Sequence, residues 1–262
     1  MYDILIALLV VAAIGLLAGI LLSVASHFFH VPEDEKALAL RACLPGANCG
    51  ACGYAGCDEY AHALAAGGVR SNLCIPGGDG TAEELAGILG IPAEDVIEHV
   101  AVVHCNGTCD ATSKKAIYDG TGTCRAASVL YGGPGACSYG CLGCGDCAEV
   151  CPVDAICLQD GIARIDRRVC VGCGLCAKTC PKGIISLVPD NGNVVVLCSN
   201  QDKGAVARKV CTNACIGCKK CEKNCPENAI TVVNNLAVVD YAKCSGCGAC
   251  VEGCPTHCLK TL

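Results

Sequence analysis

The run Cys141-Leu-Gly-Cys144-Gly-Asp-Cys147-Ala-Glu-Val-Cys151-Pro152 decides the fold of this chain. Its C-x2-C-x2-C-x3-C-P spacing is typical of cysteines that bind 4Fe-4S clusters. The same spacing returns three times, each time with a proline after the fourth cysteine. The cysteines of the three further runs are Cys170, Cys173, Cys176 and Cys180; Cys215, Cys218, Cys221 and Cys225; and Cys244, Cys247, Cys250 and Cys254.

The four runs form two pairs, and the second pair is offset from the first by 74 positions. This regularity indicates an internal duplication. In such a pair the first three cysteines of each run hold one cluster, and the fourth ligates the other cluster. The predicted ligand sets are Cys141, Cys144, Cys147 with Cys180; Cys170, Cys173, Cys176 with Cys151; Cys215, Cys218, Cys221 with Cys254; and Cys244, Cys247, Cys250 with Cys225.

Composition supports metal ligation over disulfides. The chain has 29 cysteines in 262 residues, no Trp and two Phe. A disulfide framework is typical of short secreted chains below about 100 residues, whereas tightly spaced cysteines suit a shared metal centre. Bound clusters would then replace much of an aromatic core. The formal net charge of -6 argues against a nucleic-acid partner.

The N-terminal run from Ile4 to Ala25 has 22 residues without charge or proline. A helix of that length spans a bilayer core of about 30 Å, so we expect a retained single-pass anchor. A cleaved signal peptide is the alternative, but no basic residue precedes the run. Lys36 and Arg41 follow it, which favours a cell-membrane protein with the iron–sulfur domains on the cytoplasmic side.

A second cysteine group, Cys49, Cys52, Cys57 and Cys74, makes another plausible four-thiolate site. Together with the surrounding Leu-Pro-Gly-Ala-Asn-Cys49-Gly-Ala-Cys52-Gly-Tyr-Ala-Gly-Cys57, it resembles the small iron–sulfur domain of the RnfB family and of corrinoid iron–sulfur proteins. Residues 137–262 resemble bacterial two-cluster ferredoxins. The order of anchor helix, small domain and ferredoxin repeats extends the resemblance to the RnfB family over essentially the whole chain.

The resemblance implies an electron-transfer subunit of an ion-translocating ferredoxin:NAD+ oxidoreductase, the Rnf complex. Such a protein takes electrons from soluble reduced ferredoxin and passes them to other subunits of a membrane complex that reduces NAD and pumps Na+ or H+. An iron–sulfur subunit of another membrane oxidoreductase and a zinc-stapled interaction module are the alternatives. A corrinoid-type methyl carrier would need a cobalamin domain, and only ferredoxin repeats follow the small domain.

A third cysteine group is harder to assign. We predict a sixth cluster on Cys105, Cys109, Cys124 and Cys137, with buried reduced thiols as the alternative. Cys124 and Cys137 are 13 positions apart, as are Cys198 and Cys211, at the same offset of 74. The remaining five cysteines are Cys43, Cys157, Cys198, Cys211 and Cys258.

Separate expectations apply to these five cysteines. Cys157 and Cys258 are expected to be core residues. Cys198 and Cys211 would form a seventh site only with ligands from outside the chain, and Cys43 could compete with Cys49 as a ligand.

No motif in the sequence points to a catalytic residue on this chain. There is no G-x-G-x-x-G between a strand and a helix, no Walker A run, and no credible nucleophile–base arrangement. We therefore expect one-electron transfer between 4Fe-4S clusters, with flavin and NAD chemistry on partner subunits.

The predicted fold class is α+β: a transmembrane helix, a small helical 4Fe-4S domain, and two tandem ferredoxin-like modules. Residues 81–103 are expected to form two short helices, with Thr81 and Glu84 as a capping box and Pro92 starting the second helix. The predicted domains are residues 1–30, anchor; 31–103, small domain with helical spacer; 104–136, cysteine-containing connector; 137–193, first module; and 194–262, second module.

Overall fold

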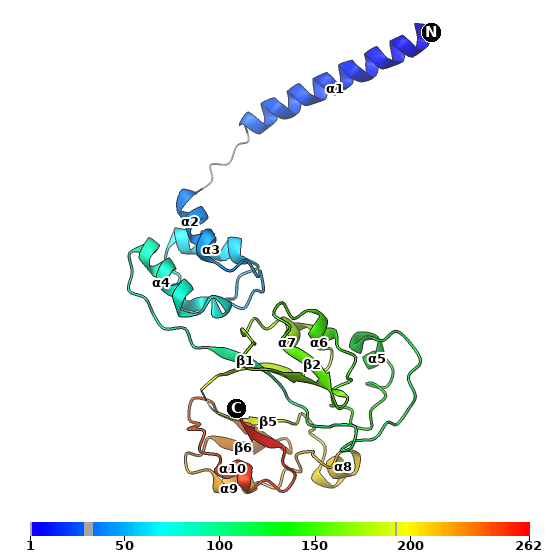
Figure 1. Cartoon of the computed structure of the whole chain (residues 1–262), viewed down its shortest axis with the longest axis vertical. Coiled ribbons are helices and arrows are strands. Elements are labelled where there is room, and N and C mark those ends of the chain that lie inside the picture. The colour runs from blue at the N-terminus through cyan, green and yellow to red at the C-terminus, as the bar shows by residue number, and fades with distance from the viewer. Residues whose placement is uncertain (1, 29–33, 192) are drawn as a thin grey trace.

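The structure is a computed structural model that describes residues 2–28, 34–191 and 193–262. Helix α1 (Tyr2–Phe28) extends from the rest of the chain (Figure 1). In the part of the chain that is described, no helix combines the length and the apolar character that a membrane span requires. The predicted anchor includes residues 1, 29 and 30, which lie outside the described residues.

The small domain is a cluster of short helices. Helix α2 (Glu35–Cys43) starts where the Asp34 carboxylate accepts a hydrogen bond from the backbone N–H of Lys36, at 3.0 Å. The core holds Leu40, Leu64 and Leu85, each at most 1% exposed. The other elements of the domain are α3 (Cys57–Ala66), η1 (Ser71–Leu73), η2 (Ile75–Gly77) and α4 (Gly78–Leu89).

Of the two helices predicted over residues 81–103, the structure has only the first, with a different start. Helix α4 begins at Gly78, so Thr81 lies inside the helix and not at its N-cap. Residues 92–103 contain no helix. Within them, His99–Val103 form strand β1, which pairs antiparallel with β4 (Ile185–Pro189). The valine-rich end of this segment favours a strand, and a partner strand in the ferredoxin region satisfies its backbone.

Two ferredoxin-like copies follow, each built from two antiparallel strand pairs. The first copy contains the β1–β4 pair and a hairpin of β2 (Ile156–Gln159) with β3 (Ile162–Ile165). The second copy contains β5 (Val194–Val196) paired with β8 (Leu259–Thr261), and a hairpin of β6 (Ile230–Val233) with β7 (Leu236–Val239). The helices are α5 (Cys124–Val129), α6 (Asp146–Glu149), α7 (Leu175–Thr179), α8 (Gly204–Val210), α9 (Lys220–Asn224) and α10 (Ala249–Glu252).

The turns of the two hairpins have the same backbone conformation. Asp160 and Gly161 have φ angles of 52° and 81°, and Asn234 and Asn235 have φ angles of 49° and 64°. Two successive residues with positive φ form the turn that matches the right-handed twist of the flanking strands, and Gly, Asn and Asp tolerate it best. The duplicated backbone geometry thus survives although the turn sequence differs between copies.

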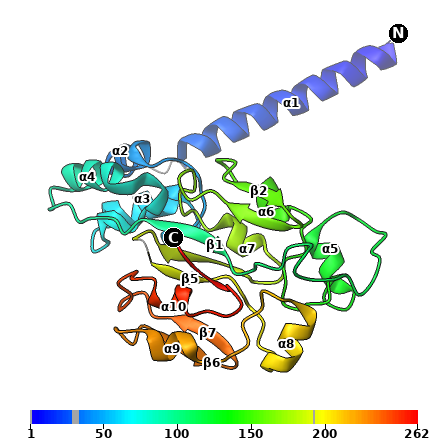
Figure 2. The same cartoon turned by 60° about the horizontal axis from the view of Figure 1, so that its bottom comes forward.

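The two copies lie side by side, with β1 and β5 between them (Figures 1 and 2). Val100, Val102, Val188 and Val195 form a small buried cluster at this junction. Because β1 completes the first copy, that copy begins well before residue 137, where the sequence suggested its boundary. The segment predicted as a spacer and connector is therefore part of the ferredoxin architecture.

Candidate metal centres

The structure brings together the cysteines of five of the six predicted sets. We number these sets as sites, each defined by its residues. They are site 1 (Cys49, Cys52, Cys57, Cys74), site 2 (Cys151, Cys170, Cys173, Cys176), site 3 (Cys141, Cys144, Cys147, Cys180), site 4 (Cys215, Cys218, Cys221, Cys254) and site 5 (Cys225, Cys244, Cys247, Cys250).

Site 1 combines Cys49 and Cys52 from the loop between α2 and α3 with Cys57 at the start of α3 and Cys74 between η1 and η2. The Asn48 side-chain oxygen accepts a hydrogen bond from the backbone N–H of Cys57, at 2.9 Å, and so fixes the start of α3. The Tyr60 hydroxyl donates to the carbonyl of Arg70, at 2.7 Å, which holds the chain before Cys74. Burial raises the pKa of the Cys74 thiol to about 11. A buried thiol of this kind is expected to ionise when a metal replaces its proton.

Sites 2 and 3 share the first ferredoxin copy. Cys180 lines the same cavity as Cys141 and Cys147, while Cys151 lies beside Cys176, so the fourth cysteine of each run reaches the other loop. Burial raises the pKa of Cys147 to about 12. The Cys151 sulfur accepts a hydrogen bond from the backbone N–H of Ala155, at 3.3 Å. Backbone donors to sulfur stabilise thiolate ligands and tune a cluster.

Sites 4 and 5 repeat this arrangement in the second copy. The Cys225 sulfur accepts from the backbone N–H of Ala229, again at 3.3 Å. Cys258 adds a further thiol to site 4, since its sulfur lies 3.6 Å from that of Cys254. With Cys258 as the hydrogen-bond donor, the pKa of Cys254 falls to about 4 and that of Cys215 to about 6. Cys258 is buried as expected, but it contacts the predicted ligands of a cluster.

The four cysteines predicted to form a sixth site do not come together. Cys124 lies at site 3, where the Asp146 carboxylate accepts from its backbone N–H at 2.7 Å. Burial and the adjacent Cys124 raise the pKa of Cys144 to about 11. Cys109 is exposed and packs against the β2–β3 turn at Gly161. The structure thus divides the predicted set between site 3, the β2–β3 turn and a cavity that holds Cys105 and Cys137.

Cys105 and Cys137 instead line a cavity at the junction of the two copies. The other two cysteines at this cavity, besides Cys141 of site 3, are Cys198 and Cys211. We call this the central cavity. The sequence placed Cys198 and Cys211 outside the six predicted sets, as a seventh site only with ligands from outside the chain. A shared sequence pattern relates Cys105 to Cys198. In both Val102-Val103-His104-Cys105 and Val195-Val196-Leu197-Cys198, the two valines end a strand and the cysteine follows two positions later.

Two other thiols lie away from these sites. The Cys43 sulfur lies 3.5 Å from the carbonyl oxygen of Ala39, and burial together with Glu84 raises its pKa. Cys157 is exposed on β2, so its expected place in the core is wrong. None of the 29 cysteines, all of them described, forms a disulfide.

The surroundings of the cysteine sulfurs in sites 1 to 5 are those of cluster ligands. No group of three or more His, Cys, Asp or Glu side chains in residues 2–28, 34–191 and 193–262 is placed to hold one metal ion. Buried cysteines with backbone N–H groups directed at sulfur are the ligand environment that a 4Fe-4S cluster requires.

Two family descriptions cover most of these sites. Residues 44–76 match the family described as a putative Fe-S cluster, and residues 140–184 and 214–258 match the 4Fe-4S dicluster domain. These matches, with the cross-braced cysteine loops, define an iron–sulfur protein with one small cluster domain and two dicluster modules.

Relatives that match most of the chain carry the assignment further. The chain is 44% identical over 236 residues to the B subunit of the Na(+)-translocating ferredoxin:NAD(+) oxidoreductase complex of Acetobacterium woodii, covering 90% of this chain and 71% of that protein. It is 43% identical to the proton-translocating counterpart of Clostridium ljungdahlii, covering 93% and 87%. It is 37% identical to the B subunit of the ion-translocating oxidoreductase complex of Methanosarcina acetivorans, covering 90% and 89%. The chain belongs to this family, the B subunits of Rnf-type complexes.

The tight loops of the sites depend on glycine, which predicts a clear difference between two substitutions. Gly143 (φ 70°) and Gly183 (φ 61°) both have left-handed backbones. A Cβ at Gly143 would collide with the carbonyl oxygen of Gly161, whereas a Cβ at Gly183 meets nothing within 4 Å. We expect Gly183→Ala to cost only about 1–2 kcal/mol of backbone strain, and Gly143→Ala to cost about 1–3 kcal/mol more through overpacking.

The measurement is anaerobic thermal unfolding, followed by loss of cluster absorbance and by circular dichroism. Gly143→Ala is expected to release the cluster of site 3 at a lower temperature than Gly183→Ala does. Equal midpoints for the two variants would contradict the close contact between the first cysteine loop and the β2–β3 hairpin.

Proposed function

We propose that this chain is the membrane-anchored electron-transfer component of an Rnf-type complex. It would accept electrons from reduced ferredoxin and pass them through its 4Fe-4S clusters to other subunits, which couple NAD+ reduction to Na+ or H+ translocation. The observation that carries the proposal is the gathering of the cysteines of sites 1 to 5 into four-thiolate sets, two pairs of which are cross-braced. The relatives are subunits of such complexes, which supports partner subunits for this chain.

The role of the chain's own residues is to hold and tune the clusters. Sites 1 to 5 would ligate five clusters, which supply one-electron carriers when bound. The protein contributes thiolates, burial, and backbone donors such as those of Ala155 and Ala229, which set each potential. Flavin and NAD chemistry would belong to partner subunits.

Contacts between the small domain and the first ferredoxin copy suggest how electrons would reach site 1. The Lys178 ammonium on α7 donates to the carbonyl of Cys49, at 2.6 Å. A Cβ on Gly172 would lie 3.0 Å from the Ile75 side chain of the small domain. The pKa of the Cys173 thiol in site 2 is raised by burial and also by Cys49, which lies close by. Site 2 is therefore the neighbour of site 1, and this supports site 1 as the output end, next to the anchor in sequence.

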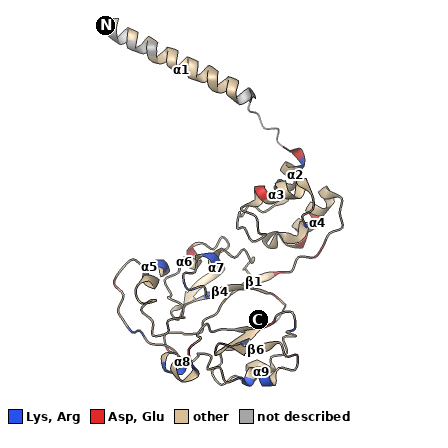
Figure 3. Ribbon diagram, turned by 180° about the vertical axis from the view of Figure 1, so that it is seen from behind, with Lys and Arg blue, Asp and Glu red and all other residues tan. Residues whose placement is uncertain are grey.

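The second module has the features of an input end. Cys218 of site 4 and Cys247 of site 5 are exposed, unlike the cysteines of sites 1 to 3. Lysine and arginine gather on α8 and α9, beside site 4 (Figure 3), on a chain whose net charge is negative. An acidic electron carrier would be attracted to this surface. The exposed basic residues are Lys203, Arg208, Lys209, Lys219, Lys220 and Lys223.

The anchor is proposed from the uncharged run Ile4–Ala25, with one pass through the cell membrane and the clusters on the cytoplasmic side. We expect the full chain to sediment with membranes and to resist extraction by high salt. A chain lacking residues 1–33 should be found in the supernatant with its clusters intact. Recovery of the full chain in the salt-extracted supernatant would contradict the anchor.

The function is tested first by composition. Protein purified without oxygen should contain iron and acid-labile sulfide in equal amounts, at least about 20 of each per chain for five 4Fe-4S clusters. Reduced ferredoxin should bleach the cluster absorbance. Zinc without sulfide would instead establish the interaction-module alternative, and copurifying subunits would distinguish an Rnf complex from another membrane oxidoreductase.

The direction of electron flow predicts the effect of Cys52→Ala. Loss of one thiolate should remove or convert the cluster of site 1 while the ferredoxin repeats remain reducible by ferredoxin. Turnover of the whole complex should then fall by more than about tenfold, because the output end is broken. Cys43→Ala is the matched control in the same domain and should keep near-normal turnover. Unchanged turnover in Cys52→Ala would refute this order.

The proposed input surface predicts a charge effect. In the full complex, Lys220→Glu with Lys223→Glu should raise the KM for ferredoxin about tenfold at low ionic strength, with the difference shrinking as salt increases. The control, Lys36→Glu with Arg70→Glu, makes the same charge change on exposed residues of the small domain. An equal rise in both double variants would show a general charge effect and contradict docking on α9.

A further inference from the structure

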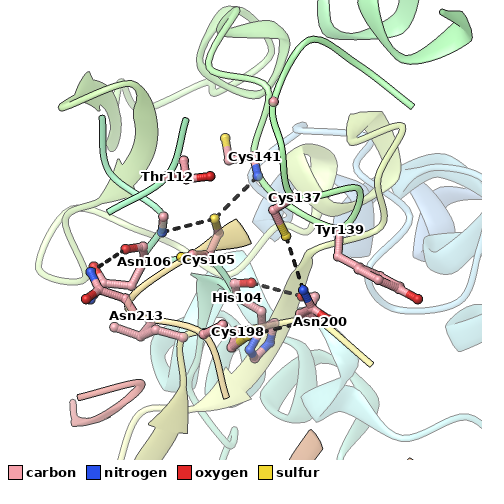
Figure 4. A pocket seen from close by; sticks show the side chains of 17 residues that line it. His104, Cys105, Asn106, Thr112, Cys137, Tyr139, Cys141, Cys198, Asn200 and Asn213 are labelled. Atoms are coloured by element: carbon pink, nitrogen blue, oxygen red, sulfur yellow. Dashed lines mark hydrogen bonds between the residues drawn. The ribbon is translucent and has the colours of Figure 1, made fainter. Parts of the chain in front are cut away.

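The central cavity is lined by four cysteines that no family description covers. Cys105, Cys198 and Cys211 are each at most 8% exposed, and Cys137 is half-buried. Figure 4 shows the side chains of Cys105, Cys137 and Cys198 around the cavity. The family matches end at residue 76, resume at 140–184, and resume again at 214–258, so these four positions fall outside all of them.

The sulfur atoms of Cys105 and Cys198 accept hydrogen bonds from backbone N–H groups at equivalent positions. Cys105 accepts from the backbone N–H of Gly107 at 3.4 Å and from that of Cys141 at 3.3 Å. Cys198 accepts from Asn200 at 3.4 Å and from Cys215 at 3.2 Å. In each case the donors are the residue two positions on and the first cysteine of the following ferredoxin run. Two donors on each buried sulfur are the environment of a thiolate ligand.

The strands that precede these cysteines are also equivalent. Val103 pairs with Ile185 in the first copy, and Val196 pairs with Leu259 in the second. Ile185 and Leu259 differ by the repeat offset of 74 positions, whereas Val103 and Val196 differ by 93. The first copy therefore carries a 19-residue insertion between Cys105 and Cys137.

With the insertion removed, Cys105 matches Cys198 and Cys137 matches Cys211. Cys124 shares the offset of 74 with Cys198 only because it lies inside the inserted segment. The cavity is therefore lined by the same two cysteine positions contributed once by each copy. A four-thiolate site built from two equivalent pairs follows from the duplication itself.

Hydrogen bonds across the junction hold the walls of the cavity. The His104 ring bonds through Nδ1 to the carbonyl of Val196 and through Nε2 to the Ser186 hydroxyl, both at 2.6 Å. The Asn213 side chain donates to the carbonyl of Asn106, at 2.8 Å. The Asn200 amide lies 3.5 Å from the Cys137 sulfur and donates to it (Figure 4). These contacts hold in place the segments that carry the four cysteines, and none of them joins one cysteine to another.

Neutral thiols are the alternative state for these buried groups. Neutral thiols in a core pack like small apolar residues and need no N–H donors. The paired donors are therefore better explained by thiolates bound to metal.

We propose that Cys105, Cys137, Cys198 and Cys211 ligate a sixth 4Fe-4S cluster, which links the two ferredoxin modules. The proposal deepens the proposed function and rests on it for the supply of electrons by reduced ferredoxin. Cys141 of site 3 and Cys215 of site 4 each donate a backbone N–H to a sulfur at this cavity. The sixth cluster would therefore lie directly between sites 3 and 4.

This position completes a path of six clusters from site 5 through sites 4, the central cavity, 3 and 2 to site 1. At each step one electron leaves a reduced cluster and reduces its oxidised neighbour, with no bond formed or broken and no proton transferred. The two modules have no other predicted ligand set between them in the part of the chain that is described. Removing the sixth cluster should therefore separate the path into two halves.

The test compares two double variants of the full chain, purified without oxygen. Wild-type protein should contain about 24 iron and 24 sulfide per chain. Cys198→Ala with Cys211→Ala should contain about 20 of each, and reduced ferredoxin should then reduce only the clusters of sites 4 and 5, as counted by EPR. The control is Cys109→Ala with Cys157→Ala, two exposed cysteines outside the five sites, and it should keep about 24.

The outcomes separate this proposal from the proposed function. About 20 iron in the wild type, or no loss in Cys198→Ala with Cys211→Ala, would overturn the sixth cluster while leaving electron transfer through sites 1 to 5 intact. Iron loss only in the control would restore the spacing-based set, through Cys109, and overturn ours. Absence of sulfide in the wild type would overturn the proposed function instead.

A variant that loses more than one cluster has misfolded, so Cys198→Ser and Cys211→Ser are made singly to keep side-chain volume. Each should lower iron by no more than one cluster and alter one EPR signal. Unaltered signals in both single variants would again overturn the proposal.

Discussion

The structure depends on the backbone N–H groups that point at cysteine sulfur. Each cysteine loop must curl tightly enough to present its own amides to its own thiolates, and that curl requires left-handed residues at fixed places. Gly143, Gly172, Gly217 and Gly246, each between the first two cysteines of a run, have φ between 63° and 71°. Because residues with side chains rarely adopt this conformation, glycine is favoured at these positions and the sequence of each loop can vary little. The spacing of the cysteines and the shape of the backbone are two aspects of one constraint.

That constraint explains why so much could be predicted from the sequence. The ligand sets of sites 2 to 5 follow from local spacing, and the structure gathers the same residues. Strands β2, β4 and β6 begin at or next to Ile156, Ile184 and Ile230, which are buried apolar residues that follow three of the cysteine–proline pairs. Site 1 was also accessible, since three of its cysteines lie within nine positions.

What sequence reasoning missed comes from contacts between distant segments. Strand β1 was mistaken for a helix because its partner, β4, lies more than 80 positions away, and a strand of five residues has no strong pattern of its own. The pairing of Cys105 with Cys198 was hidden by the inserted segment, which placed Cys124 at the repeat offset of 74. An offset identifies equivalent residues only where no insertion intervenes, and strand register is the safer guide.

The junction between the copies shows what the duplication achieves. Two ferredoxin modules joined by a flexible linker would exchange electrons only when they happened to approach each other. Here Val100, Val102, Val188 and Val195 pack the two copies together, and the equivalent cysteines of both face one cavity. Because the four ligands come from both copies, a group bound there stabilises only the docked arrangement, by the same linkage through which any ligand favours the state it binds. Ligation at the junction therefore fixes the geometry of the modules and the electron path together.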